Sequence, residues 1–239
     1  MASTTTIEQV ELTRYVQSTF KIKSPQGVVW IDPFMVTSEH IGDDKADLIL
    51  LTHEHGDHFS VDAINAVSKP GTRLTCPNSG VENQIRGNVS AELTVMKEGD
   101  TQDLAGINVQ AVAGYNTFHP RNDGHNSFNV GYIFGVGGQR VLHTGDTDII
   151  PEFSTFGALD IAMVPIGGNG YTMNVREAAQ TLALTLKPKV AIPMHYGFAF
   201  NADVDQFRFL LGRSVQLEVL DAVFPPMNIR PAGGSASQR

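Results

Sequence analysis

The sequence predicts an α/β protein in which strands alternate with helices in two halves of the chain, with the sheets packed inside and the helices outside. Short apolar runs at residues 28–31 and 47–51 indicate buried strands. Stretches at residues 175–186 and 205–211 have the amphipathic pattern of helices. Residues with metal-binding side chains follow three separate apolar runs, as expected at the strand ends where open α/β sheets bind ligands.

The N-terminal half begins with strands. Phe20 and Ile22 alternate with lysines, which is typical of a half-buried strand, and a Ser-Pro-Gln-Gly turn at residues 24–27 precedes the next strand. Apolar residues spaced three apart at 61–67 predict a short helix. The expected strands of this half are residues 10–15, 18–23, 28–31, 47–51 and 73–76.

The C-terminal half repeats the alternation of strands and helices. Gly137-Gly138 predicts the turn of a hairpin. Asn174 and Glu177 have the spacing of an N-terminal capping pair for the helix at 175–186, which Pro188 ends. The strands at residues 93–96 and 106–112 are expected in a turn-rich, antiparallel region, and the later expected strands are residues 128–136, 139–143, 159–165, 190–194 and 215–220.

Length and composition indicate one globular domain. The chain has 239 residues, of which 41% are hydrophobic and 18% are charged, and this is enough to form a substantial core. We expect a single domain over residues 9–224, a flexible N-terminus at residues 1–8 and a disordered tail at residues 225–239, which is rich in Pro, Gly and Ser.

Charge and hydropathy argue against several classes of partner. The formal net charge is −8 and the basic residues are scattered, whereas a nucleic-acid-binding protein carries a basic patch. No apolar stretch approaches the ~20 residues of a membrane span, and residues 1–6 lack the features of a signal peptide. We therefore expect a cytoplasmic protein with a small-molecule substrate, without nucleic-acid or membrane partners; a homo-oligomer is compatible with the sequence.

The densest group of metal-binding side chains directly follows the apolar run at residues 47–51. Imidazole and carboxylate are ligands that suit Zn, Fe or Mn. The period of two along an extended backbone points alternate side chains to one side, and Gly56 permits a turn toward a second centre. The four residues are His53, His55, Asp57 and His58.

Three quoted segments carry a resemblance to a known family. The motif His53-x-His55-x-Asp57-His58, the element Gly145-Asp146-Thr147 and the strand end Pro193-Met194-His195-Tyr196-Gly197 resemble the metallo-β-lactamase superfamily of binuclear metallohydrolases. The resemblance covers about residues 10–220 and implies a four-layer αββα sandwich. The downstream segments are similar to the branch that contains ascorbate-6-phosphate lactonase and uncharacterised prokaryotic metal-dependent hydrolases.

The resemblance also implies which residues bind two divalent metal ions, with zinc as the first choice and Mn or Fe as alternatives. It assigns His53 and His55 to the first metal and Asp57 and His58 to the second. Asp146 would bridge the two metals. His195 would complete the site of the second metal.

The remaining ligand of the first metal departs from the family pattern. Many relatives have a histidine where this chain has Asn116, and an amide is a poor zinc ligand. We expect His119 to take this place; the alternatives are Asn116, His125 or an under-coordinated first metal. A second departure is Val16-Gln17, where relatives often have Gly-His. This change alters the surroundings of the site without removing a ligand.

The expected activity is hydrolysis of a small ester, lactone or related acyl bond by a hydroxide held between the metals. Asp57 is expected to orient this nucleophile and pass a proton to the leaving group. His125 and Tyr196 are candidate oxyanion or substrate contacts, and for Tyr196 packing is an equal alternative. The competing hypotheses are a phosphodiesterase, including an RNase Z-like nuclease, a di-iron redox protein, and a non-catalytic member of the superfamily.

Overall fold

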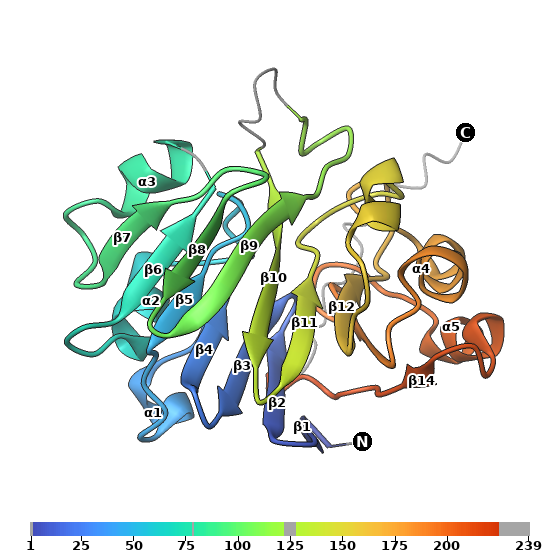
Figure 1. Cartoon of the computed structure of the whole chain (residues 1–239), viewed down its shortest axis with the longest axis horizontal. Coiled ribbons are helices and arrows are strands. Elements are labelled where there is room, and N and C mark those ends of the chain that lie inside the picture. Colours follow the sequence, from blue (N-terminus) through green and yellow to red (C-terminus); the bar gives the residue numbers. More distant parts are fainter. Residues whose placement is uncertain (1, 78, 122–127, 225–239) are drawn as a thin grey trace, which may run out of the picture.

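The computed structural model describes residues 2–77, 79–121 and 128–224. In these residues the chain forms two seven-stranded sheets that face each other across a common apolar core (Figure 1). Strands that follow each other in the chain are also neighbours in the sheet. The two halves of the sequence therefore form one sheet each.

The first sheet is antiparallel from its first to its fourth strand and parallel from its fourth to its seventh. The antiparallel part consists of hairpins, and the parallel part is joined through helices. In order its strands are β1 (Thr4–Ile7), β2 (Val10–Val16), β3 (Thr19–Ser24), β4 (Gly27–Ile31), β5 (Leu48–Leu50), β6 (Arg73–Cys76) and β7 (Glu92–Val95).

The second sheet has the same pattern, with an antiparallel part followed by a parallel part that starts at its fourth strand. The predicted hairpin across Gly137-Gly138 joins its third and fourth strands. Its strands are β8 (Thr101–Leu104), β9 (Ile107–Ala113), β10 (Val130–Val136), β11 (Gln139–His143), β12 (Ile161–Pro165), β13 (Val190–Met194) and β14 (Gln216–Leu217).

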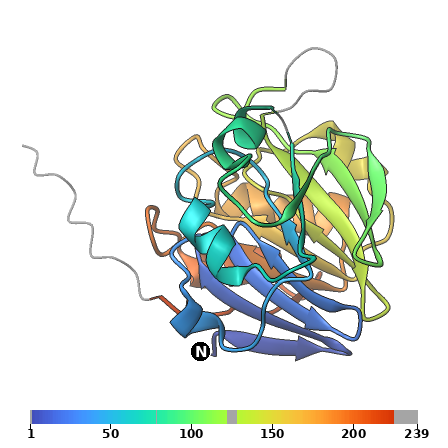
Figure 2. The same cartoon turned by 90° about the vertical axis from the view of Figure 1, so that its left-hand side faces the viewer.

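Helices cover the outer face of each sheet, so that the molecule has the four layers αββα (Figures 1 and 2). The first sheet is covered by α1 (Ser38–Ile41), α2 (Val61–Val67) and α3 (Ser79–Ile85). The second is covered by the 3₁₀ helix η1 (Pro151–Thr155), α4 (Val175–Thr181), the π-helical turn η2 (Leu182–Leu186) and α5 (Val204–Leu211). The predicted fold class is confirmed. No helix within the described ranges is long and apolar enough to cross a membrane.

The core between the sheets is made by the inward faces of both. Phe20 and Ile22 of β3 belong to the same buried cluster as Val109 of β9 and Tyr132 and Phe134 of β10. Burying such side chains contributes about 1.5–3 kcal/mol each to folding, relative to leaving them in water. This apolar core holds one sheet against the other. Both sheets therefore position the loops at the edge that they share.

The structure differs from the predicted elements at several places, including three elements that the sequence did not predict: α1, β8 and η1. Residues 4–7, which were expected to be flexible, form β1, because their backbone pairs with the exposed edge of β2. The helix predicted at 175–186 has the Asn174–Glu177 capping box but changes to a π-helical turn at Leu182. The strand predicted at 215–220 pairs only at Gln216 and Leu217. The predicted disordered tail lies outside the described residues.

Candidate metal centre

The predicted motif lies on the loop that leaves β5. All three residues of β5 are buried, and Leu51 and Thr52 continue the strand direction into the core. His53 and His58 are fully buried, and the side chain of Asp57 remains 30% exposed. The buried strand thus holds the loop rigidly while one carboxylate still reaches solvent.

One group of possible metal ligands contains His53, His55 and His119, whose ligand atoms lie within 4.8 Å of one another. His119 Nε2 lies 3.1 Å from His55 Nδ1. His119 comes from the segment after β9 in the second sheet and is fully buried. The fold therefore brings His119 to the place where the sequence needed a third ligand for the first metal.

A second group contains Asp57, His58 and His195, again with ligand atoms within 4.8 Å of one another. His195 directly follows β13, and its Nε2 lies 3.7 Å from Asp57 Oδ2. The backbone of His195 is left-handed, with a φ of +57°. That conformation turns the chain sharply at the strand end, where the imidazole meets the ligands from the first sheet.

Asp146 lies between the two groups. Its Oδ2 atom is 3.0 Å from His195 Nε2 and 3.4 Å from His58 Nε2, both in the second group. The same atom is 3.9 Å from His119 Nε2 and 4.0 Å from His53 Nε2, both in the first group. A single carboxylate oxygen within reach of four imidazoles from both groups is the arrangement that a bridging ligand requires.

The donor atoms at this centre fit metal ions. In the part of the chain that the structure describes, five buried atoms of these ligand side chains have no hydrogen-bond partner: His53 Nε2, His58 Nε2, Asp146 Oδ1 and both ring nitrogens of His195. A buried polar atom without a partner costs about 1–3 kcal/mol. Cations bound at the centre would give the Nε2 and Oδ1 atoms partners, and an all-His/Asp set suits Zn, Mn or Fe.

Hydrogen bonds on the far side of the rings fix which nitrogen faces the centre. His58 Nδ1 lies 2.7 Å from Asp32 Oδ2, and His53 Nδ1 lies 3.0 Å from the Thr52 hydroxyl. The Thr52 hydroxyl donates to Asp32 Oδ2 at 2.7 Å. Such outer contacts orient metal-binding histidines and raise their basicity. Asp32, which directly follows the strand at residues 28–31 and precedes Pro33, is a residue of the site to which the sequence analysis assigned no role.

Asn116 supports His119 and does not take its place. The Asn116 side-chain oxygen lies 2.8 Å from His119 Nδ1 and also accepts hydrogen bonds from the backbone N–H groups of Phe118 and His119. The Asn116 amide nitrogen donates to the Tyr171 carbonyl. With its oxygen and nitrogen both engaged, Asn116 acts as the outer partner that turns His119 Nε2 toward His53 and His55.

Gln17 occupies the second position at which the sequence departs from its relatives. It is fully buried, and its side-chain amide donates to Asp57 Oδ2 at 3.0 Å. Its backbone carbonyl accepts a hydrogen bond from the His195 N–H at 3.1 Å. The turn between β2 and β3 therefore contacts two of the three residues in the second group.

The electrostatics differ among the histidines of the centre. Burial lowers the pKa of His58 and His195, but the neighbouring Asp146 carboxylate outweighs it and raises both pKa values. Burial lowers the pKa of His53 well below its usual value and that of His119 to about 4, so both imidazoles are neutral at pH 7 and free to donate electrons to a metal. Burial alone would raise the pKa of Asp146, but the His195 and His58 imidazoles lower it well below the usual range. Partial burial raises the pKa of Asp57, but His195, His58 and Gln17 outweigh it and lower the pKa. Asp57 is therefore also ionised.

The structure describes one of the two other predicted site residues, Tyr196, and does not place it at the centre. His125 lies outside the described residues. The Tyr196 ring is stacked beneath Arg14, whose guanidinium carbon is 4.0 Å from the ring centroid, and the Tyr196 hydroxyl donates to the Leu220 carbonyl at 3.5 Å. These contacts correspond to the packing alternative for Tyr196.

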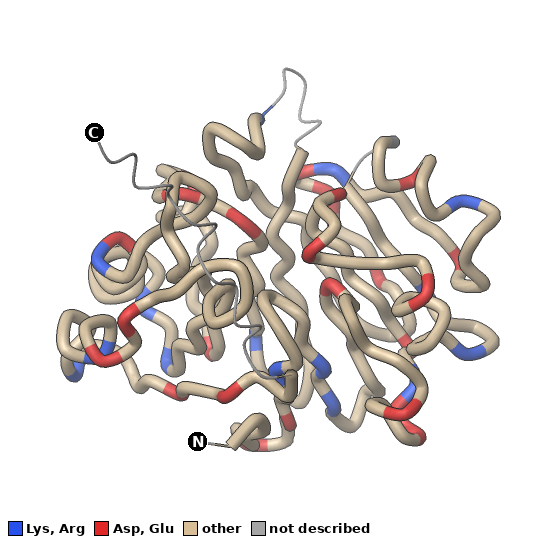
Figure 3. The backbone as a smooth tube through the Cα atoms, turned by 180° about the vertical axis from the view of Figure 1, so that it is seen from behind, with Lys and Arg blue, Asp and Glu red and all other residues tan. Residues whose placement is uncertain are grey.

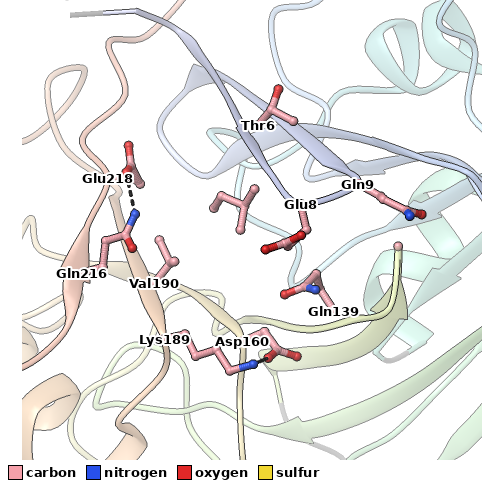
Figure 4. A pocket seen from close by; sticks show the side chains of 11 residues that line it. Thr6, Glu8, Gln9, Gln139, Asp160, Lys189, Val190, Gln216 and Glu218 are labelled. Carbon is pink, nitrogen blue, oxygen red and sulfur yellow. Dashed lines mark hydrogen bonds and ion pairs between the residues drawn. The ribbon is translucent and has the colours of Figure 1, made fainter.

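A separate hollow of about 470 Å³ lies at the opposite edge of the sandwich, between the β1–β2 turn and the starts of β11 and β13 (Figure 4). Its lining residues include Glu8, Gln139 and Glu218. Lys189 there is neutralised by Asp160, with 2.7 Å between the charged atoms. No residue of the metal-ligand groups described above lines this hollow, so the candidate site is the metal centre.

Sequence comparison decides the family. Residues 11–195 match the model of the β-lactamase superfamily domain. The chain belongs to the β-lactamase superfamily. Its relatives within the superfamily include a UPF0173 metal-dependent hydrolase of Thermococcus kodakarensis, which is 33% identical over 207 residues that cover 80% of this chain and 88% of the relative.

Solved structures with the superfamily fold resemble the whole sandwich. A protein described as a candidate metal-dependent hydrolase from Parabacteroides distasonis has a TM-score of 0.76 and 28% identity, and the match covers 93% of this chain and 100% of the other. CmlA, a diiron β-hydroxylase from Streptomyces venezuelae, has a TM-score of 0.69 at 14% identity, over 91% of this chain and 54% of CmlA. At that identity, CmlA shares the superfamily fold alone.

Proposed function

We propose that this chain is a binuclear metal-dependent hydrolase that cleaves a small ester, lactone or related acyl bond. The relatives that share most of its length are named metal-dependent hydrolases. The observation that carries the proposal is the position of Asp146 Oδ2, within 4.0 Å of imidazoles from two separate three-residue groups. One mononuclear site would need neither the second group nor a carboxylate between the groups.

The ligands named above would hold two divalent ions, which when bound lower the pKa of water toward ~7 and polarise the carbonyl under attack. The chain contributes the proton transfer. Asp57 is the partly exposed carboxylate of the centre, and Gln17 fixes its Oδ2 atom. An ionised Asp57 can take the proton of the attacking water and deliver it to the leaving oxygen.

The charge around the centre favours acyl over phosphoryl substrates. A phosphodiester is anionic, and Arg or Lys side chains commonly bind its oxygens in addition to metal ions. Here Arg121 is bound by Glu98 and Glu152. Arg121 is also the only Lys or Arg in the described loops at the metal edge, which are residues 51–60, 114–121, 144–150, 166–174 and 195–203.

Metal content and turnover, measured on the same samples, test the proposal. We expect about two ions per chain in the wild type, by analogy with two-metal hydrolases. His119→Ala should retain about one ion and lose turnover, because the first group keeps only His53 and His55. His40→Ala, which removes an exposed histidine of α1, is the matched control and should retain both ions and activity.

The substrate panel separates the reaction types. Hydrolysis of lactones and carboxylic esters without hydrolysis of bis-(p-nitrophenyl) phosphate is the expected result. The opposite selectivity would make the chain a phosphodiesterase. Fewer than two ions in the wild type together with no hydrolysis would reject the binuclear hydrolase, and equal metal content in wild type and His119→Ala would reject His119 as a ligand.

A further inference from the structure

Aromatic rings flank the metal centre on both of its sides. The Phe128 ring lies beside the first group, with its centroid 5.1 Å from that of His55 and 5.6 Å from that of His119. The Phe200 ring lies beside the second group, stacked on His195 at 5.3 Å with 20° between the planes. Both phenylalanines are partly exposed, so apolar surface is presented to solvent next to the reactive centre.

On the side of the second group the rings continue outward as a row. Tyr171 follows Phe200 with 5.3 Å between ring centroids, and Phe118 stacks on Tyr171 at 4.3 Å with 30° between the planes. We call Phe200, Tyr171 and Phe118 the aromatic row. Phe118 is 50% exposed, and the other two rings are partly exposed.

The aromatic row is assembled from three distant segments at the edge that holds the ligands. Phe118 follows β9, Tyr171 follows β12 and Phe200 follows β13. Each ring would bury more apolar surface inside the sandwich than it does here. Adjacent, partly exposed rings are typical of a surface that binds a partner or ligand, and flat rings stack favourably on them.

The surroundings of the aromatic row disfavour an anionic ligand. A hollow of about 380 Å³ next to it is lined by two carboxylates, Asp148 and Glu177, and by no Lys or Arg. Gly170 belongs to this lining, and a Cβ atom added to it would be in van der Waals contact with the Phe118 ring. Arg121, the basic residue of these loops, is paired with Glu98 and Glu152. A phosphate or carboxylate tail would therefore meet like charge.

We propose that the substrate is an uncharged carboxylic ester or lactone whose acyl part carries an aromatic group, which stacks on the aromatic row while the acyl carbon lies at the metal centre. This inference rests on the proposed hydrolase function. In the reaction, the oxygen of water bonds to the acyl carbon and the bond from that carbon to the leaving oxygen breaks. The proton of the water passes to the leaving oxygen, giving an acid and an alcohol.

Three methyl esters with the same leaving group test the substrate class. Methyl 3-phenylpropanoate carries the ring, methyl butanoate lacks it, and monomethyl succinate replaces it with a carboxylate. We expect kcat/KM for the phenyl ester to exceed that for the butanoate by about tenfold, which corresponds to ~1.4 kcal/mol. The succinate ester should be the poorest of the three.

Variants show whether the aromatic row is responsible. Phe118→Leu keeps an apolar side chain and removes the ring, so KM for the phenyl ester should rise about three- to tenfold while methyl butanoate is unaffected. Phe209→Leu is the matched control, because Phe209 is 83% exposed on α5. Binding of the unreactive 3-phenylpropanamide, followed by ligand-observed NMR, should weaken in Phe118→Leu and stay unchanged in Phe209→Leu.

The outcomes distinguish failure of this inference from failure of the proposed function. Hydrolysis of all three esters with equal efficiency, or a preference for the succinate ester, would overturn the aromatic substrate and leave the hydrolase in place. A protein with two ions that hydrolyses none of the esters and no lactone would overturn both. If KM for the phenyl ester rises as much in Phe209→Leu as in Phe118→Leu, the aromatic row has no specific role in binding.

Discussion

Gln17 acts on two metal-binding residues through two different parts of itself. Its side chain bonds Asp57 and its backbone carbonyl bonds His195. The residue adopts a left-handed conformation, with a φ of +46°, and this turn places both groups toward the centre. A substitution of the side chain would therefore release Asp57 and leave the His195 contact intact.

This separation gives a prediction for Gln17→Leu. Loss of an outer partner of a metal ligand typically costs 10–100-fold in metal affinity or activity, so we expect kcat to fall by roughly that factor. The metal bound in the second group should dissociate more readily in a chelator titration. Gln102→Leu, at an exposed position of β8, is the control. Unchanged kcat and metal affinity in Gln17→Leu would show that Asp57 needs no support.

Gly167 is required by the close approach of two strand ends. A Cβ atom added there would lie 2.2 Å from the His195 carbonyl oxygen and 3.3 Å from His195 Nδ1. Because the first of these is a backbone atom, the end of β13 must move to relieve the clash. The Gly167 position thus controls the second group without contacting a metal.

We expect Gly167→Ala to lose about one of the two ions per chain and most of the turnover, since His195 leaves its place. Elemental analysis of the purified variant measures the first effect, and an ester assay measures the second. Gly135→Ala in β10 adds a Cβ atom that meets nothing within 4 Å, so it should behave as the wild type. Wild-type metal content in Gly167→Ala would contradict this account.

At the scale of elements, the loop between α1 and β5 is held to the first sheet by charge. Asp44 in this loop accepts hydrogen bonds from Lys21 at 2.6 Å and Lys23 at 2.8 Å, both on β3. Partial burial raises the pKa of Asp44, but the two ammonium groups outweigh it and lower the pKa below its usual value. The folded state therefore favours the ionised carboxyl.

The sign of this shift predicts an acid-dependent loss of stability. Above the usual Asp pKa the contribution of Asp44 is complete, and it is lost as the pH falls through the lower pKa of the folded state. Asp44→Asn should thus be less stable than the wild type at pH 7, and the difference should shrink as the pH falls below about 4. Urea unfolding at both pH values measures it, with exposed Asp43→Asn as control. A difference that does not change with pH would contradict the assignment.

Strands with a continuous apolar run, such as β5 and β13, could be predicted from the sequence because burial on both faces leaves a direct pattern. The resemblance implied that the ligands from distant segments meet, but the outer contacts around them could not be predicted. The bond from Asp32 to His58 joins residues 26 positions apart, and that from Gln17 to Asp57 joins residues 40 apart. The approach of His119 depends on a turn closed by the Asn116 side chain, and β1 forms only because β2 offers it an edge.

At the scale of the whole molecule, the two sheets repeat one pairing scheme. In each, the first four strands are antiparallel and the fourth begins a parallel run, β4 in one sheet and β11 in the other. Asp32 directly follows β4 and Asp146 lies three residues after β11, so each half has a carboxylate just beyond its fourth strand. One is the outer partner of His58, and the other lies between the two ligand groups.

Acidic and basic residues are interspersed over both halves (Figure 3).

Each ligand group takes two residues from the first half of the chain and one from the second. An ion held by all three residues of either group would therefore require the halves to be docked, and its binding energy would add to the energy of docking. By mass action, an ion at 100 times its dissociation constant stabilises the native state by about 2.7 kcal/mol. The supply of metal in the cell would then affect how fast the protein unfolds and is degraded. It would therefore set the amount of the protein as well as its catalytic rate.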